Sequence, residues 1–398
     1  MASTATAPSR RAPHLRVVRP GEAAARPAHR AAARPDATIA VLLLSTLALV
    51  LVGLVMVLSA SSVEAYTRYG SSFLFFRRQL VFAFVGTLGM MLAARMSYRA
   101  WERLCVPLLL LVAALLVLVL HPAAGTVAGG SARWLELGPV TVQPSEFAKL
   151  AVITFGAALL ARRWDRLHDL RLLVVPLVPV VAGLGLLIML QPDLGTAVII
   201  VACVFVLLFV AGARMKHLLI GGLGTAVLGL GLIRLEGYRW TRFVSFLDPW
   251  ADPQGSGYQV IQSLIGLTSG GPLGLGLGAG RQKWLYVPNA HTDFIFSIIG
   301  EELGLLGMLV VLALFGALVW AGTRIAMRAP DAFGRLLAAG ITGWIGVQAL
   351  VNLGAVTGML PITGVPLPLV SFGGSSLVAC MVGVGMLVSI GRRSARRR

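Results

Sequence analysis

The chain has 398 residues, of which 57% are hydrophobic and only 13% are charged. Soluble domains average about 25% charged residues, so this composition would expose much apolar surface to water. The net charge of +18 is compatible with nucleic-acid binding, but the basic residues lie between long apolar runs rather than in one continuous patch. The composition therefore excludes an ordinary soluble protein, argues against a nucleic-acid partner and favours a membrane protein.

Ten apolar runs are long enough to cross the hydrocarbon core as helices, which takes about 20 residues each. They cover residues 38–61, 79–95, 104–120, 146–161, 172–190, 196–212, 218–235, 294–322, 333–357 and 376–391. The predicted fold class is all-α, a polytopic membrane protein with about ten transmembrane helices. An even number of crossings places both ends of the chain on the same side.

The chain divides into a transmembrane domain over 38–391 and two basic ends. Residues 1–37 are rich in Ala, Arg and Pro and lack a periodic apolar face, so we expect a disordered tail. The run after it is long enough to span, which argues against a cleaved signal peptide. Residues 392–398 form a second basic tail. The N-terminal tail either binds another protein or lies against anionic membrane lipids.

The distribution of basic residues sets the orientation, because short cytoplasmic loops carry the excess of Lys and Arg. An inward N-terminus places both tails in the cytoplasm together with the basic residues of four further connections. These are Arg95, Arg99, Arg103, Arg162, Arg163, Arg166, Arg171, Arg214, Lys216, Arg324, Arg328 and Arg335. The opposite orientation leaves only a minority of the basic residues inside, so we predict cytoplasmic ends.

Two outward segments are longer than a simple connection needs. Residues 121–145 and 236–293 have compositions that do not indicate disorder, and long loops of this kind usually carry function. The second, between the seventh and eighth helices, holds Tyr238, Trp240, Phe246, Trp250, Tyr258, Trp284 and Tyr286. These aromatic residues either anchor the loop at the interface or cover a lipid-linked substrate. Residues 358–375, the last outward segment, are rich in Pro and Gly. We therefore expect re-entrant or irregular backbone there, with its polar groups satisfied by protein or water.

Ionisable residues close to the membrane are costly to bury, so each is a candidate functional residue. Arg78 starts the second helix on the outer side, where it is either a solvated helix end or a contact for an anionic headgroup. Pro144 suits the first turn of a helix, and Glu146 suits the dipole there. Lys149 follows three residues later, so the two charges form an ion pair, or Lys149 meets pyrophosphate and Glu146 helps to hold a divalent cation.

Two aspartates stand at breaks between loops and apolar runs. Asp193, in Gln-Pro-Asp-Leu-Gly, lies in a predicted discontinuous helix and either caps the next helix or contacts substrate. His291 and Asp293 lie where the long loop enters the eighth helix. Desolvation there would raise the pKa of Asp293 and suit it as a general base near neutral pH. A helix cap is the alternative for this aspartate.

Other cofactor and metal chemistry finds little support in the sequence. Alternate glycines from Gly274 to Gly280 resemble a phosphate-binding motif, but no βαβ unit surrounds them. The sequence contains no zinc-ligand spacing, Walker motif or Gly-x-Ser-x-Gly elbow, so we expect no organic cofactor and no ATP hydrolysis. All three cysteines lie within apolar runs, which argues against disulfides and thiolate clusters: Cys105, Cys203 and Cys380.

Several short strings, taken together and in order, resemble the SEDS family (shape, elongation, division and sporulation). They are Val57-Leu-Ser-Ala-Ser61, Ala132-Arg-Trp134, Gln143-Pro-Ser-Glu146, Gln191-Pro-Asp-Leu-Gly195, Phe246-Leu-Asp-Pro249, Gly257-Tyr-Gln259, His291-Thr-Asp-Phe294, Gly300-Glu-Glu-Leu-Gly304 and Leu367-Pro-Leu-Val-Ser-Phe-Gly-Gly-Ser-Ser376. The resemblance covers residues 38–391. The Leu-Ser-Ala-Ser string, Gly276-Leu-Gly278 and Gln282-Lys283 favour the division branch of the family over the elongation branch. One departure is Asn289, where the family usually has an acid.

The resemblance implies a peptidoglycan glycosyltransferase that polymerises lipid II at the outer face of the bacterial cytoplasmic membrane, in septal synthesis. The family's essential acid maps onto Asp293, which we expect to deprotonate the acceptor 4-hydroxyl. Arg78 and Lys149, with a divalent cation (Mg²⁺ or Mn²⁺) near Glu146, would stabilise the pyrophosphate leaving group. The expected substrate contacts are Arg78, Arg133, Glu146, Lys149, Asp193, Lys283, His291, Ser371 and Ser375. The expected partners are a class B penicillin-binding protein and other division proteins.

Two other functions fit parts of the sequence. Intramembrane charges and broken helices also suit a lipid II flippase, although such transporters usually contain internal repeats and none is convincing here. A division scaffold without chemistry is the third alternative, and it would tolerate loss of Asp293.

Overall fold

The computed structural model describes residues 37–122, 125–128, 131–138, 140–164, 170–235, 237–284, 286–288 and 290–396. The predicted N-terminal tail, apart from its last residue, and Asn289 lie outside the described residues. The helices are α1 (Ala37–Tyr69), α2 (Leu74–Arg95), α3 (Tyr98–Leu120), α4 (Pro144–Ala161), α5 (Leu170–Met189), α6 (Leu194–Val210), α7 (Met215–Leu235), α8 (Gly237–Leu247), α9 (Tyr258–Ser269), α10 (Ile295–Met327), α11 (Ala332–Val356) and α12 (Gly374–Arg396). The strands are β1 (Gly125–Ala128), β2 (Ser131–Leu137) and β3 (Val140–Val142).

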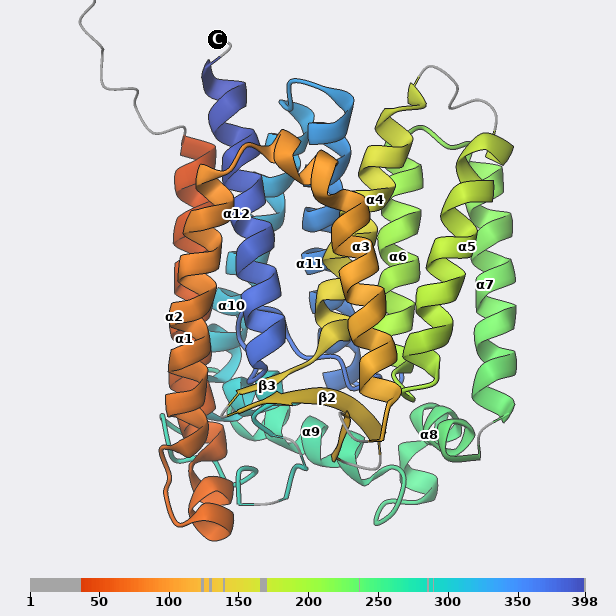
Figure 1. The fold of residues 1–398 in the computed structure, drawn as a ribbon. Helices are drawn as coiled ribbons and strands as arrows, with labels where there is room; N and C mark the ends of the chain where they lie inside the picture. Colours follow the sequence, from red (N-terminus) through yellow and green to blue (C-terminus); the bar gives the residue numbers. More distant parts are fainter. Residues whose placement is uncertain are drawn as a thin grey trace, which may run out of the picture. The chain divides into compact units, whose positions relative to one another are not determined.

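The ten predicted membrane crossings correspond to α1 to α7 and α10 to α12, which run through the bundle together (Figure 1). Within the described ranges, eight helices are long and apolar enough to cross a membrane by themselves, and α5 and α6 are shorter apolar helices. The helices α1, α2 and α3 extend beyond the predicted apolar runs through turns that contain charged residues, among them Glu64, Arg77 and Glu102. The all-α, polytopic prediction is confirmed.

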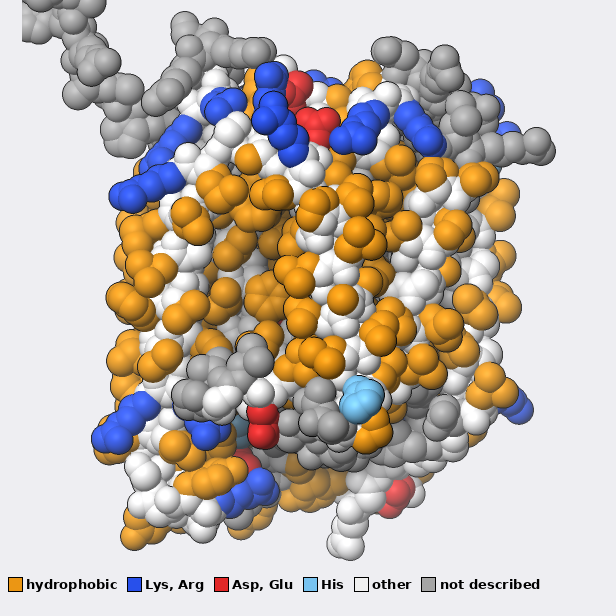
Figure 2. All heavy atoms as spheres, viewed as in Figure 1, with side chains coloured by type: hydrophobic (Ala, Val, Ile, Leu, Met, Phe, Trp, Pro, Cys, Tyr) orange, Lys and Arg blue, Asp and Glu red, His pale blue; other side chains and the backbone are white. Residues whose placement is uncertain are grey.

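The two ends of the bundle differ in charge. Helix α1 begins and α12 ends at the same end (Figure 1). Figure 2 shows Lys and Arg side chains gathered around that end, above a broad belt of apolar side chains. Because positively charged loops stay in the cytoplasm, this end is the cytoplasmic one. The opposite end, which carries the sheet, α8 and α9, faces outward.

Burial is concentrated at the centre of the bundle. Helix α4 is almost wholly buried, and it starts with Pro144 in its first turn and Glu146 close behind, as predicted. Helix α7, by contrast, has no buried residue among those described and presents large apolar side chains such as Leu219 and Leu223. In a membrane these faces contact lipid tails, so their exposure in the isolated chain is expected.

A small antiparallel sheet, in the order β1-β2-β3, lies in the first outward segment and was not predicted. Leu135 on β2 pairs with Gly125 on one side and Val142 on the other, and it is buried. The strands are short and interrupted by Gly and Pro, so the sequence shows only a weak period-two pattern. Packing of the sheet against the bundle stabilises strands that would be marginal alone.

The two predicted backbone breaks are both present. Helix α5 ends before Gln191 and α6 begins after Asp193. Between α11 and α12, residues 357–373 form neither helix nor strand, yet Val365, Leu367 and Val370 within them are buried. Irregular backbone is therefore enclosed by protein at this depth, which is the condition under which a membrane tolerates it.

Candidate active site

Asp293 lies in the loop just before α10, outside the membrane-spanning helix. The N-cap residue of α10 is Phe294, and no side chain caps the helix, so the predicted capping alternative for Asp293 is wrong. The carboxyl group is half-buried and points toward the irregular segment, where its Oδ2 would lie 3.7 Å from a Cβ atom on Gly364. Among the described residues, none donates a hydrogen bond to this carboxylate. It is therefore free to accept a proton from a ligand.

The electrostatic surroundings of Asp293 adjust its basicity. Burial raises the pKa of Asp293 to about 6, against the opposing effect of Arg242, His291 and Arg133 and with a small further rise from Asp193. A carboxylate with such a pKa is mostly ionised at neutral pH and is a stronger base than an ordinary aspartate. The predicted upward shift, caused by desolvation, is confirmed.

His291 is enclosed by three elements. Its Nδ1 lies 3.3 Å from Glu64 Oε2 on α1, and its ring packs between Phe75 on α2 and Phe372 of the irregular segment, at 4.7 and 5.5 Å between ring centroids. The backbone amide of Phe372 donates to the His291 carbonyl at 2.9 Å. His291 thus fastens the loop that carries Asp293 to α1 and α2.

Arg133, on β2, fastens the sheet to the break between α5 and α6. Its guanidinium donates to the backbone carbonyl of Gln191 at 2.9 Å and to that of Pro192. The sheet therefore holds this arginine over the outer end of the broken helix. In this position Arg133 is close enough to act on the charge of Asp293.

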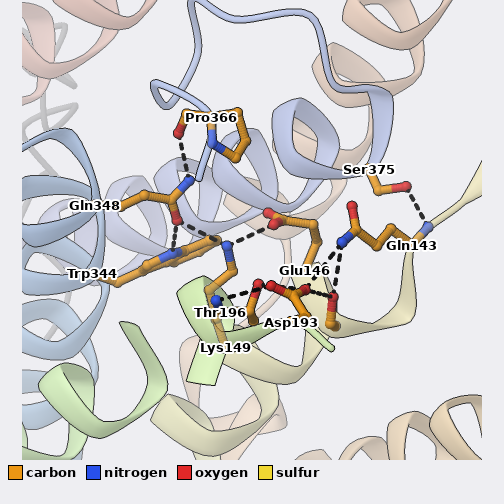
Figure 3. Close-up of polar contacts among 10 residues, drawn as sticks. Gln143, Glu146, Lys149, Asp193, Thr196, Trp344, Gln348, Pro366 and Ser375 are labelled. Carbon is orange, nitrogen blue, oxygen red and sulfur yellow. Dashed lines mark hydrogen bonds and ion pairs between the residues drawn. The ribbon is translucent and has the colours of Figure 1, made fainter. Parts of the chain in front are cut away.

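Asp193 is the N-cap of α6 and also a junction between elements (Figure 3). It accepts from the amide and hydroxyl of Thr196 at 3.2 and 2.9 Å, which confirms the capping interpretation. It also accepts from Ser145 Oγ at 3.3 Å and Gln143 Nε2 at 3.4 Å. The backbone amide of Gln143 donates to Ser375 Oγ at 2.9 Å. Asp193 and Ser375 therefore join the starts of α4, α6 and α12.

Lys149 and Glu146 form the predicted ion pair, 2.8 Å between Nζ and Oε1, in the interior of the bundle. Nζ also donates to Gln348 Oε1 at 2.9 Å and lies over the Trp344 ring (Figure 3). Lys149 has no exposed surface. In this conformation its ammonium cannot reach a pyrophosphate in the outer leaflet. Of the two predicted alternatives, the structure therefore contains the ion pair with Glu146.

Glu146 does not fit the expected role of cation ligand. A divalent cation takes several oxygen ligands, and the described residues contain no group of three or more His, Cys, Asp or Glu that could provide them. One carboxylate oxygen of Glu146 already accepts from Lys149, whose ammonium would repel a cation at that point. Its other oxygen, Oε2, is buried without a hydrogen bond among the described atoms. We therefore assign no step of the reaction to a metal at Glu146.

The glycine-rich stretch packs against the start of α10. The backbone amides of Leu275 and Gly276 donate to the carbonyls of Glu301 and Glu302 at 2.9 and 3.0 Å. A Cβ atom on Gly274 would lie 2.2 Å from the Glu302 carbonyl oxygen. Helix α10 bends at Gly304, whose φ is 66°. The alternate glycines thus permit close backbone contact at this bend.

Lys283 follows this stretch and is nearly buried. Its ammonium donates to Glu302 at 3.1 Å and to the Gly278 carbonyl, and Glu302 also accepts from Ser59 Oγ on α1 at 2.7 Å. Glu302 therefore joins α1, the glycine-rich stretch and α10. The predicted contact of Lys283 with substrate remains a prediction.

We expect Gly274→Ala to destabilise the protein. Its φ of +80° is unfavourable for alanine, and the added methyl group would clash with backbone atoms of Glu302, which cannot change rotamer as a side chain can. Such strain costs about 1–3 kcal/mol before the steric clash is added. The matched control is Gly316→Ala, in the interior of α10 with open space around it. Thermal unfolding in detergent should show a lower midpoint for the first variant and an unchanged or higher midpoint for the second.

A family model described as "Cell cycle protein", FtsW/RodA/SpoVE, matches residues 40–396. The chain belongs to this SEDS family. Stage V sporulation protein E of Bacillus subtilis (strain 168) is 44% identical over 353 residues, covering 89% of this chain and 96% of that protein. The probable peptidoglycan glycosyltransferase FtsW of Geobacter metallireducens is 42% identical over 357 residues, covering 89% and 94%.

Solved structures of the SEDS family share the fold. A chain in the structure described as "Structural coordination of polymerization and crosslinking by a peptidoglycan synthase complex" has a TM-score of 0.71 and 35% identity, covering 88% of this chain and 96% of that one. The rod shape determining protein RodA of Thermus thermophilus has a TM-score of 0.64 and 31% identity, covering 88% and 95%. The predicted family membership is confirmed.

The SEDS motifs gather at the outward end but in different roles. Ser371 is buried, where its hydroxyl donates to the Thr292 carbonyl at 2.5 Å and accepts from the Leu367 amide at 2.8 Å. Arg78 is exposed in the first turns of α2, with no hydrogen bond or ion pair in the described ranges. For Arg78, Arg133, Glu146, Lys149, Asp193, Lys283, His291, Ser371 and Ser375, substrate contact stays a prediction.

Sequence reasoning missed several polar residues that organise the site. Ser59 and Glu302 lie within motif strings, so the resemblance contained a signal for them. Gln348 and Asn352 lie inside the apolar run of α11, where neither residue by itself differs from a tolerated polar residue. Their spacing of four residues on one helix face was the available signal.

Proposed function

We propose that the chain is a peptidoglycan glycosyltransferase that polymerises lipid II, with Asp293 as the general base. The observation that carries the proposal is the Asp293 carboxylate, half-buried and unpartnered in the described structure, at the outward end of a SEDS protein. Relatives over 40% identical are named probable peptidoglycan glycosyltransferases. A positioned carboxylate with a pKa of about 6 suits deprotonation of a sugar hydroxyl.

In the proposed reaction, Asp293 accepts the proton of the acceptor 4-hydroxyl as that oxygen attacks the anomeric carbon of the donor. The new oxygen–carbon bond forms while the bond from the anomeric carbon to pyrophosphate breaks. The leaving undecaprenyl pyrophosphate takes the electron pair. Positive charge near the leaving group lowers the barrier. Arg133 and Arg242 supply such charge beside Asp293, and the exposed Arg78 supplies it at the membrane surface.

The proposed partner is a single-span class B penicillin-binding protein, which would crosslink the new glycan. One similar solved chain comes from a peptidoglycan synthase complex that coordinates polymerization and crosslinking. Several relatives bear the name FtsW, which supports a place at the division septum with other division proteins. The chain is a multi-pass membrane protein, and we place it in the bacterial cytoplasmic membrane.

The test is polymerisation of purified lipid II by the native chain with this partner, the partner carrying an inactive transpeptidase site. We expect glycan strands on a gel. A parallel assay with vesicles measures movement of labelled lipid II across the bilayer. Translocation without polymerisation would replace the proposal by the flippase alternative, and neither activity would favour the scaffold.

A further inference from the structure

The irregular segment between α11 and α12 forms one wall beside Asp293. Gly364 lies opposite the carboxylate, and its φ of +71° bends the backbone at that point. A Cβ atom on Gly195, at the start of α6, would lie 2.5 Å from the Thr363 carbonyl oxygen. The segment is thus held closely against α6 on one side. The distance between this segment and Asp293 therefore depends on the contacts that the segment makes on the side away from α6.

Asn352 on α11 provides that second attachment. Its side-chain Nδ2 donates to the backbone carbonyl of Asp293 at 2.8 Å and to that of Val365 at 2.8 Å. The side-chain amide of Asn352 therefore donates one hydrogen bond to each of the two backbone segments that flank the carboxylate. Asn352 is 2% exposed, so it has no surface with which to contact substrate.

Gln348 lies one helical turn earlier and provides a comparison. Its Nε2 donates to the Pro366 carbonyl at 3.0 Å, while its Oε1 accepts from Lys149 and from Trp344 Nε1. It holds the same irregular segment (Figure 3) and is equally buried. Among the described contacts, however, only Asn352 of this pair bonds to Asp293. Substitution of Gln348 therefore tests the attachment of the irregular segment alone, whereas substitution of Asn352 also tests the attachment of Asp293.

We propose that Asn352 is a positioning residue for Asp293, fixing the aspartate backbone to the wall at Gly364 through its two carbonyl bonds. The inference rests on the proposed function of Asp293 as a base. Loss of these bonds leaves two buried carbonyls unsatisfied and lets the wall and the loop separate. Water then reaches the carboxylate, and the base moves away from its productive position.

Separation should also change the acid–base behaviour of Asp293. The charged groups that face it are Arg242 from α8, Arg133 from β2, His291 from its own loop and Asp193 before α6. Substitution of Asn352 leaves the identity of all four of these residues unchanged. Because burial is the main cause of the raised pKa, admission of water should lower the pKa of Asp293 toward that of an ordinary aspartate.

The experiment compares Asn352→Leu with Gln348→Met, each nearly isosteric and without an amide. In the polymerisation assay with the partner protein, we expect Asn352→Leu to lower kcat by roughly 10²-fold with little change in KM, since misplacement of about 1 Å has such an effect. The acid limb of its pH profile should move to lower pH. Gln348→Met should keep the native acid limb, although its thermal midpoint falls as well.

A second measurement does not depend on the proposed activity. Dicyclohexylcarbodiimide modifies protonated carboxyl groups in apolar surroundings, and peptide mass spectrometry reports its reaction with Asp293 as a function of pH. The midpoint should lie at about 6 in the native chain, lower in Asn352→Leu and unchanged in Gln348→Met. Equal midpoints in all three proteins would overturn the positioning role. A lowered midpoint in Asn352→Leu would support the positioning role whatever the activity of the protein. If Asp293→Asn nevertheless kept full polymerising activity, the proposed function would be overturned and the positioning role would stand.

Discussion

Polymerisation of lipid II should fall by about 10²–10⁴-fold in Asp293→Asn, the range that loss of a general base produces. The substitution is nearly isosteric and keeps the backbone bond from Asn352 to position 293. It removes only the proton acceptor. The native rate should also fall about tenfold per pH unit below about 6, because protonation removes the carboxylate form. The residual rate of Asp293→Asn should lack this acid limb.

The control for Asp293→Asn is its thermal midpoint in detergent and its binding of the partner protein, both of which should match the native chain. A variant that is stable, binds the partner and polymerises at the native rate would contradict the assignment of Asp293 as the base. An unchanged acid limb in the variant would assign that limb to another group.

Lys149→Met should cost about 3–5 kcal/mol of folding stability, the usual result of leaving one buried charge without its partner. It leaves Glu146 in the interior of the bundle without its ammonium partner and removes a donor from Gln348. The free energy of unfolding, measured in mild detergent, is the direct check. Methionine keeps most of the side-chain volume, so loss of packing contributes little to the difference.

The double variant Glu146→Gln, Lys149→Met separates structure from substrate contact. Removal of both charges should restore much of the stability, since neutral pairs replace buried ion pairs at little cost. If Lys149 acts only through the fold, the restored protein should polymerise lipid II as well. A stable double variant without activity would assign Lys149 a contact with the pyrophosphate after all, reached through a conformation other than this one.

The crossings and their orientation could be predicted because they depend on local composition. An apolar run must become a helix in the bilayer wherever it occurs, and Arg and Lys resist translocation regardless of the fold. The cap at Asp193 and the first turn of α4 were predictable for the same reason, since the residues that determine them are neighbours in sequence. Asp293 stood out because a single charge precedes an apolar run.

The interior of the site could not be predicted, because each contact joins residues far apart in the chain. Lys149 was expected near the outer surface, but Gln348 and Trp344 on α11 enclose it. The sequence argued against a phosphate-binding motif at the alternate glycines, but it did not show that they pack against Glu301 and Glu302 on α10. Asn352 carried no local sign of its two carbonyl partners.

The bend at Gly304 has a consequence for how the protein responds to its membrane. The first turns of α10 are anchored to the glycine-rich stretch, because the carbonyls of Glu301 and Glu302 accept from the Leu275 and Gly276 amides at 2.9 and 3.0 Å. The remainder of the helix crosses the bilayer and tilts to match its thickness. Such tilting can be absorbed at Gly304, where the helix is already interrupted. We therefore expect the height of Asp293 to be set by the outer loops, so that lipid chain length should change polymerisation little.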